Sequence, residues 1–273
     1  MITKNEIKTY KTILKNLPER PAKPRDIGLT MVIDKGLGIN AAQDIVDTAA
    51  EHIDFIKIGF GTSLVTGHLK EKIKIYQEAG IEVYLGGTLL EAFLVRNQLD
   101  DYLRLVDDLN LHCIEVSDGS IVMPHEDKCE LIQHLAKNFK VVSEVGSKEE
   151  GIIIHPNRWI KMMKAELQAG SYKVIAEARE SGTVGIFHKN GSAHVLLIDK
   201  IKANVDIKNI IWETPQKNQQ VYFIKHFGAN VNLGNIPTSD IIALECLRLG
   251  LRGDTFFTFI ADKNKEVRFK ESN

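Results

Sequence analysis

Residues 53–85 read IDFIKIGFGTSLVTGHLKEKIKIYQEAGIEVYL, and this stretch contains the repeating unit of the whole chain. A β-branched run at 53–58 is followed by an amphipathic helical stretch at 64–79, then Gly80, then a second β-branched run at 81–85. A glycine directly after a helical stretch is a common C-terminal cap that leads into the next strand. Strand, helix and strand in this order predict a βαβ unit with parallel strands.

The same unit recurs over most of the 273 residues. Strands are expected at 27–33, 53–58, 81–85, 111–116, 139–145, 171–177, 209–213 and 228–232, and helices between them at stretches that include 64–79, 90–109, 124–137, 157–169 and 239–249. Eight such units without a change in composition favour an α/β fold, a single-domain (β/α)8 TIM barrel, over an open doubly wound sheet.

The flanks of the barrel differ from it in composition. The barrel is expected over 25–260, behind an N-terminal extension at 1–24 with a short helix at 6–17 and a proline-rich stretch, and before a charged tail at 261–273. Three prolines within seven residues of the extension prevent regular structure there.

Charge and composition exclude several classes of protein. The net charge is -1 and the basic residues are dispersed, so the sequence gives no nucleic-acid-binding signal. Neither a signal peptide nor an apolar run of about 18 residues is present, so no membrane partner is expected. Three distant cysteines favour a reducing compartment. We therefore expect a cytoplasmic protein with small-molecule partners; the oligomeric state stays open, a homo-oligomer included.

Acidic residues end four of the expected strands. Active sites of such barrels lie at the C-terminal ends of the strands. Glu115, Glu144, Glu177 and Glu213 each share strand parity with apolar residues, so inward-facing strands would bring all four to one mouth. Clustered carboxylates repel one another and require a cation, and Mg²⁺ suits a site of oxygen ligands. The alternative is that these carboxylates form salt bridges to lysines within the barrel.

Two lysines are the basic candidates at the first strand ends. Lys57 lies among apolar residues, either as a catalytic amine or as a counter-ion for the carboxylates. Asp34 and Lys35 follow the first strand, where they are either functional charges or an ordinary charged turn.

Other segments suit anion binding. The pair Gly86-Gly87, followed by Thr88, permits close approach of a ligand to the backbone. The segment 232–240 places backbone N–H groups at a helix start after the last strand, a place where barrels bind phosphate, although ordinary helix capping explains it equally. Arg179 begins a long loop at 178–194 and is a candidate anion clamp, and the loop itself has the length of a lid.

The strand-end motifs resemble those of the phosphosulfolactate synthase family, in order and over residues 25–257. The motifs are Asp34-Lys-Gly-Leu-Gly38, Lys57-Ile-Gly-Phe-Gly-Thr62, Gly86-Gly-Thr-Leu89, Glu115-Val-Ser-Asp-Gly119, Glu144-Val-Gly146, Glu177-Ala-Arg-Glu-Ser-Gly182, Glu213-Thr-Pro-Gln-Lys217, Asn232-Leu-Gly-Asn235 and Arg252-Gly-Asp-Thr255.

This resemblance implies a (β/α)8 barrel of the carbon–sulfur lyase class. Its members add sulfite to phosphoenolpyruvate with Mg²⁺, giving (2R)-phospho-3-sulfolactate for coenzyme M in methanogens or for sulfolactate in some bacteria. For this chemistry we expect Glu144, Glu177 and Glu213 around the metal, with Glu115 and Asp118 nearby. Lys35, Lys57 and Arg179 are expected to hold the anionic groups.

The expected site divides into three groups. The metal ligands are Glu115, Glu144, Glu177 and Glu213; the catalytic candidates are Asp34, Lys35, Lys57 and Lys148; and the substrate-binding candidates are Gly87, Thr88, Ser117, Arg179, Ser181, Asn232, Gly234 and Asn235. Members of the family often carry Glu-Val-Gly-Lys-Lys after the fifth strand, whereas this chain has Ser147 before Lys148. The proton donor is therefore Lys57 or Lys148. The rival functions are another barrel lyase or aldolase on a phosphorylated acid, and a non-catalytic stress-associated relative.

Overall fold

The computed structural model describes residues 13–146, 155–179 and 181–260. The strands are β1 (Thr30–Asp34), β2 (Phe55–Ile58), β3 (Glu82–Leu85), β4 (Cys113–Val116), β5 (Lys140–Val145), β6 (Lys173–Ala176), β7 (Ile210–Glu213) and β8 (Leu233–Pro237). The helices are α2 (Ile39–Ala49), α3 (Leu69–Glu78), α4 (Gly87–Leu94), α5 (Leu99–Asp108), α6 (His125–Leu135), α7 (Pro156–Gln168), α8 (Val195–Lys202), α9 (Lys217–Phe227) and α10 (Ile241–Arg248), with 3-10 turns at Ala50–His52, Thr62–Leu64 and Ile207–Asn209.

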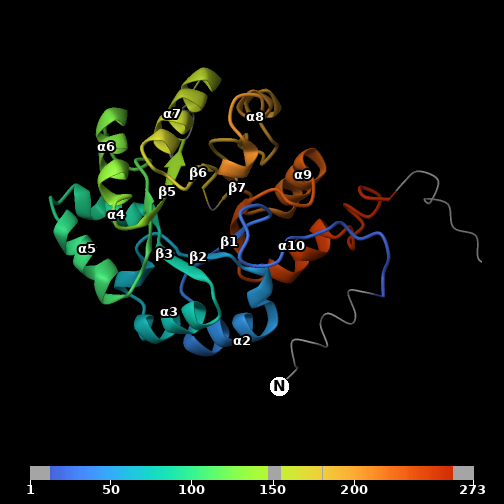
Figure 1. Cartoon of the computed structure of the whole chain (residues 1–273), viewed down its shortest axis with the longest axis horizontal. Coiled ribbons are helices and arrows are strands. Elements are labelled where there is room, and N and C mark those ends of the chain that lie inside the picture. The colour runs from blue at the N-terminus through green and yellow to red at the C-terminus, as the bar shows by residue number, and fades with distance from the viewer. Residues whose placement is uncertain (1–12, 147–154, 180, 261–273) are drawn as a thin grey trace, which may run out of the picture.

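The strands form one parallel sheet in the order β3-β2-β1-β8-β7-β6-β5-β4. The helices lie outside the ring of strands (Figure 1). The strands at the two ends of this order approach each other, and the backbone N–H of Gly87, after β3, donates to Glu115 Oε1 on β4 over 2.8 Å. The sheet is thus a nearly closed barrel, and the predicted (β/α)8 fold is confirmed.

Two apolar layers follow from the alternation of side chains along each strand. The inner layer fills the barrel with Leu29, Met31, Phe55, Tyr84, Cys113, Val142, Ile175 and Ile211. The outer face of the strands packs on the helices and makes the larger core. Because the interior is filled in this way, polar groups at its two ends lie in separate cavities.

Three expected boundaries were wrong. The expected helix at 90–109 is two helices, because Asn97 adopts a left-handed φ of 54° between α4 and α5. The described part of the expected helix at 6–17 is not helical, and Asn16 there has a φ of 63°. The last strand is not 228–232 but Leu233–Pro237.

The shift of the last strand has a physical cause. The carbonyls of Ala229 and Val231 accept hydrogen bonds from the buried Arg248 guanidinium at 2.6 and 2.7 Å, so these two carbonyls bind a side chain in place of a neighbouring strand. Glycine, asparagine and proline in Leu233–Pro237 are rare in strands, and they hid the true strand from the sequence pattern. None of the described helices has the length and apolar character needed to cross a membrane.

Candidate active site

A cavity of about 300 Å³ opens at the C-terminal ends of the strands. We call it the mouth cavity, and its lining is Ile33, Lys57, Phe60, Gly86, Gly87, Thr88, Glu115, Glu144, Glu177, Arg179, Glu213 and Asn235. The ends of all eight strands or the loops that follow them contribute to it. Groups far apart in the sequence therefore converge where barrels carry out their chemistry.

The four predicted carboxylates all face this cavity. Glu115, Glu144, Glu177 and Glu213 are each at most 4% exposed. Oxygens of Glu144, Glu177 and Glu213 lie within 4.8 Å of one another. Each glutamate follows an inward-facing apolar residue by two positions, which is why the period of the strand predicted the cluster.

Lys57 is the cation nearest to these carboxylates among the described residues. Its Nζ lies 3.0 Å from Glu213 Oε1 and 3.3 Å from Glu115 Oε2. Burial alone would lower the pKa of Lys57, but the charges of Glu115, Glu213 and Glu144 outweigh it and raise that pKa. Lys57 is therefore a protonated counter-ion between two strands.

The carboxylates exceed this counter-ion in number. Burial raises the pKa of Glu213, and Glu144 and Glu115 add to the effect, while Lys57 opposes it. Among the described residues, four buried carboxylates line this cavity beside one buried lysine, and like charges this close repel one another. A bound cation would remove the repulsion.

The donor set fits a hard divalent cation. Carboxylate oxygens are the ligands that Mg²⁺ prefers, whereas thiol and imidazole groups are absent from the lining of this cavity. Asn235 also lines it, and the buried Oδ1 of Asn235 has no hydrogen-bond partner among the described residues. An orphaned buried carbonyl beside three carboxylates points to a bound group that completes the site.

The β3 end gives the cavity its glycine wall. Gly87 is the first residue of α4, and a Cβ there would lie 2.3 Å from Ser117 Oγ and 2.9 Å from Glu115 Oε1. Thr88 follows in the lining. Ser117 itself bonds to Glu91 of α4 and supports this wall from behind.

The long loop after β6 brings one predicted residue to the mouth. Arg179 is exposed, lines the cavity and has a left-handed φ of 58°. Its backbone N–H donates to Glu177 Oε1, which fixes that carboxylate. Farther along, Phe187 and Ala193 form an antiparallel bridge. Ser181 is exposed and bonds to Thr183 within the loop at 2.8 Å.

Other predicted residues lie elsewhere. Asp34 faces outward from β1, where Lys72 Nζ lies 2.7 Å from its Oδ2 and the Tyr76 hydroxyl donates to the same oxygen. Its other oxygen accepts from the backbone of Gly36 and Leu37. Asp34 has the opposite strand parity to Ile33, so its side chain points away from the mouth cavity. Its contacts instead hold the loop that follows β1. Lys35 is exposed on this loop and does not line the mouth cavity.

The glycine and asparagine of the last strand also require correction. Asn232 precedes β8 at the opposite end of the barrel, where its amide bonds to Leu29, Lys208 and Ile210 backbone groups. Gly234 lies inside the barrel, where a Cβ would meet Met31 Cε at 2.6 Å. Of the predicted segment, Asn235 alone reaches the cavity. Lys148 lies outside the described residues.

Two lining residues, Ile33 and Phe60, were not predicted, whereas Gly86 belongs to the glycine pair expected to suit anion binding. Ile33 shares parity with the inward Met31, so its signal was available in the sequence. Phe60 has a φ of 38°, and no pattern in the sequence indicates that turn.

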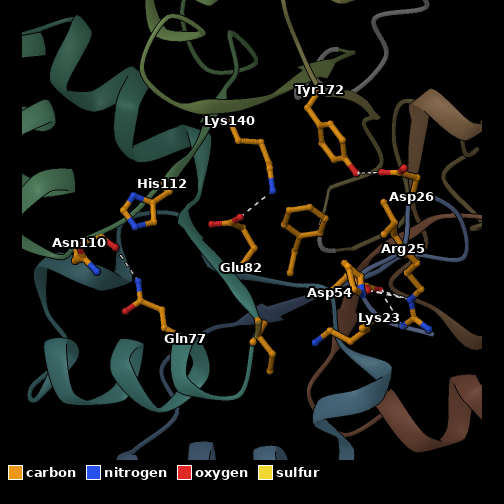
Figure 2. Close-up of a pocket in the computed structure, with 15 residues that line it drawn as sticks. Lys23, Arg25, Asp26, Asp54, Gln77, Glu82, Asn110, His112, Lys140 and Tyr172 are labelled. Carbon is orange, nitrogen blue, oxygen red and sulfur yellow. Dashed lines mark hydrogen bonds and ion pairs between the residues drawn. The ribbon is translucent and has the colours of Figure 1, made fainter. Parts of the chain in front are cut away.

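A larger cavity of about 630 Å³ lies at the other end of the barrel (Figure 2). Its charged groups have partners: Lys140 Nζ lies 2.9 Å from Glu82 Oε2, Arg25 Nε lies 2.9 Å from Asp54 Oδ1, and Lys23 Nζ donates to the backbone carbonyls of Ala50 and Ile53. Tyr172 donates to Asp26 over 2.8 Å. Because these groups satisfy one another, the smaller mouth cavity is the better candidate for catalysis.

Comparison with known proteins adds independent findings. The model of the family described as (2R)-phospho-3-sulfolactate synthase (ComA) matches residues 18–254. The chain is 41% identical to a phosphosulfolactate synthase of Bacillus subtilis, over 88% of this chain and 97% of that protein. It is 40% identical to one of Methanothermobacter thermautotrophicus, over 87% and 95%. The solved YdjI aldolase of Escherichia coli, 10% identical, superposes with a TM-score of 0.53 over 80% of this chain and 78% of that one, a likeness of fold alone.

Proposed function

The chain belongs to the (2R)-phospho-3-sulfolactate synthase family, and from this premise we propose that it adds sulfite to phosphoenolpyruvate with Mg²⁺, giving (2R)-phospho-3-sulfolactate. One observation carries the proposal: the carboxylates of Glu144, Glu177 and Glu213 converge within 4.8 Å in the mouth cavity. These three would hold the metal ion, and Asn235 Oδ1 lies in the same lining.

The reaction forms one carbon–sulfur bond and one carbon–hydrogen bond. The sulfur lone pair of sulfite attacks C3 of phosphoenolpyruvate, and the electrons of the C2–C3 double bond move to C2 and into its carboxylate. A proton then adds to C2 from one face and fixes the configuration. Bound Mg²⁺ would supply Lewis-acid stabilisation of the charge that develops on the carboxylate.

The chain's own residues orient two anions beside an acidic cluster. Arg179 at the rim is a planar donor that suits a phosphate or sulfite group. The backbone at Gly87 approaches the cavity closely because no side chain intervenes. Lys57 keeps Glu115 and Glu213 in place and lowers the net negative charge that both anions meet.

The raised pKa of Lys57 bears on its role. A lysine held protonated by neighbouring carboxylates is a poor nucleophile, so the alternative of a Schiff-base aldolase has no support from this contact. The same ion pairs support the counter-ion role, and they leave Lys148, outside the described residues, as the other candidate for the proton donor.

Phosphorus NMR tests the proposal directly. Phosphoenolpyruvate, sulfite, Mg²⁺ and protein should give a new phosphate-ester resonance at the expense of the phosphoenolpyruvate resonance. A chelator should stop this conversion, and omission of sulfite should do the same. An unchanged phosphoenolpyruvate signal in the complete mixture would refute the proposed reaction, and conversion that persists with chelator would refute the metal requirement.

A further inference from the structure

A buried lysine behind the mouth cavity connects three elements. Lys128 lies on α6 and is fully buried. Its Nζ donates to Asp118 Oδ1 at 2.9 Å and to the backbone carbonyl of Glu144 at 2.5 Å. It also lies 2.9 Å from Glu166 Oε1 on α7. An ammonium has three N–H donors, and here each has one acceptor.

The Glu144 carbonyl lies where the sheet ends. The last β4–β5 pair is Val116 with Ser143, because β4 stops at Val116. Glu144 is one residue farther along β5, beyond the last paired residue of β4. Lys128 therefore supplies the hydrogen bond that a longer β4 would have given.

The loop after β4 is held from both sides. Asp118 bonds to Lys128 on one side, whereas Glu91 of α4 accepts from the Ser117 hydroxyl and from the Ser120 backbone on the other. Glu115, three residues before Asp118, faces the mouth cavity. The position of Glu115 relative to Glu144 thus depends on contacts behind the strands.

We propose that Lys128 is a positioning residue, which ties the end of β5 at Glu144 to the β4 loop at Asp118 and so sets the geometry of the carboxylate cluster. A buried ion pair gives little net stability compared with apolar residues of the same volume. An apolar side chain on α6 could fill this space but could not bind the Glu144 carbonyl. The contact between Lys128 and the Glu144 carbonyl therefore affects the position of Glu144, a proposed metal ligand, more than the stability of the fold.

The inference rests on the cation site of the proposed function. Mn²⁺ binding tests the cation site and the role of Lys128 separately. Mn²⁺ is a paramagnetic substitute for Mg²⁺, and the free ion is counted by electron paramagnetic resonance. Lys128→Met removes the lysine from the buried Glu166 carboxylate and from the partly buried Asp118, and it risks unfolding. The decisive variant therefore combines Asp118→Asn, Lys128→Met and Glu166→Gln, which removes the charges together.

The matched control is a buried ion pair at the other end of the barrel. Arg20 Nε lies 3.2 Å from Glu245 Oε1, and both side chains are 8% exposed. Arg20→Met with Glu245→Gln removes that pair. We expect the triple variant to bind Mn²⁺ roughly 10- to 100-fold more weakly, as for other groups that orient a metal ligand. The control should keep the wild-type affinity within about twofold, by the independence of distant sites, even where urea unfolding shows an equal loss of stability.

Each outcome decides between the claims. Wild-type Mn²⁺ affinity in the triple variant, beside loss of binding in Glu177→Gln, overturns the role of Lys128 and leaves the cation site intact. Equal weakening in the control overturns it too, because the effect would then follow stability alone. Absence of Mn²⁺ binding in the wild-type protein overturns the cation site and this inference with it.

Discussion

Single residues set the charge of the mouth cavity. Glu177 is 1% exposed, and its Oε1 already accepts a hydrogen bond from the Arg179 backbone. Its carboxylate is one of three that meet within 4.8 Å. The charge of Glu177 would attract the proposed cation, whereas the hydrogen bond from the Arg179 backbone requires only an oxygen acceptor at this position.

Glu177→Gln separates these two properties. The amide oxygen can still accept from Arg179, so we expect the melting temperature to stay within a few degrees of the wild type. Turnover should fall by on the order of 1000-fold, the scale for loss of one group that stabilises developing charge. Steady-state rates at saturating Mg²⁺ measure the effect, with circular dichroism as the check on folding. Full activity in this variant would exclude Glu177 from the metal site.

The sequence predicted the residues of the site unevenly. Glu115, Glu144, Glu177 and Glu213 could be found because each follows an inward apolar residue with period two. Asp34 could not be placed from its position at a strand end alone, since one step along the strand reverses the face. The partners behind the site, such as Lys128, were hidden because a lysine near the start of a helix is usually exposed, and the sequence gives no sign that α6 buries this one.

At the scale of elements, the first residue of α4 makes a contact that links the end of β3 to β4. Gly87 N donates to Glu115 Oε1 over 2.8 Å, and its missing side chain leaves room for Ser117 and Glu115. The sequence predicted a glycine turn here, but it placed the helix start at 90 and joined α4 to α5. Glycine has a low helix propensity, so the sequence gives no sign that a helix begins at the second of the two glycines that follow β3.

Gly87→Ala tests how closely this helix start must approach β4. A Cβ at 2.3 Å from Ser117 Oγ must push the β4 end away, although the positions on α4 themselves favour alanine. We expect kcat/KM to fall by about 100-fold, the scale for a displacement of roughly 1 Å near the reacting groups. The matched control is Gly38→Ala, because a Cβ at Gly38 meets open space. Gly80→Ala is less informative, because Gly80 has a φ of 68° and an alanine there would be strained. An equal loss in Gly87→Ala and Gly38→Ala would contradict this reading.

At the scale of the whole molecule, the two ends of the barrel carry charge differently. The described lining of the mouth holds four carboxylates and one buried lysine, whereas the opposite end pairs Lys140 with Glu82 and Arg25 with Asp54, as Figure 2 shows. The barrel itself could be predicted because every β-α unit repeats one pattern. The attachment of the N-terminal segment could not, since Arg20 contacts residues more than 200 positions away.

The Arg20 contact predicts a pH dependence of stability. Burial would raise the pKa of Glu245, but the charge and hydrogen bond of Arg20 outweigh it and lower that pKa below the usual range of a glutamate. A carboxylate with a lowered folded-state pKa contributes stability that is fully present above the unfolded pKa and is lost as pH falls through the folded pKa. At pH 7, Arg20→Met should cost about 3 kcal/mol of unfolding free energy, because it leaves a buried carboxylate without its partner.

The difference in unfolding free energy between wild type and Arg20→Met, measured in urea, should shrink as the pH falls below about 4.5. The double variant Arg20→Met with Glu245→Gln removes the titrating carboxylate. Its difference from wild type should shrink over the same pH window, because wild type loses the contribution of the pair while the double variant has none to lose. A difference between wild type and Arg20→Met that stays constant from pH 7 to pH 3 would show that Arg20 stabilises the barrel through its bonds to backbone carbonyls, such as that of Gly28 at 3.0 Å, and not through Glu245.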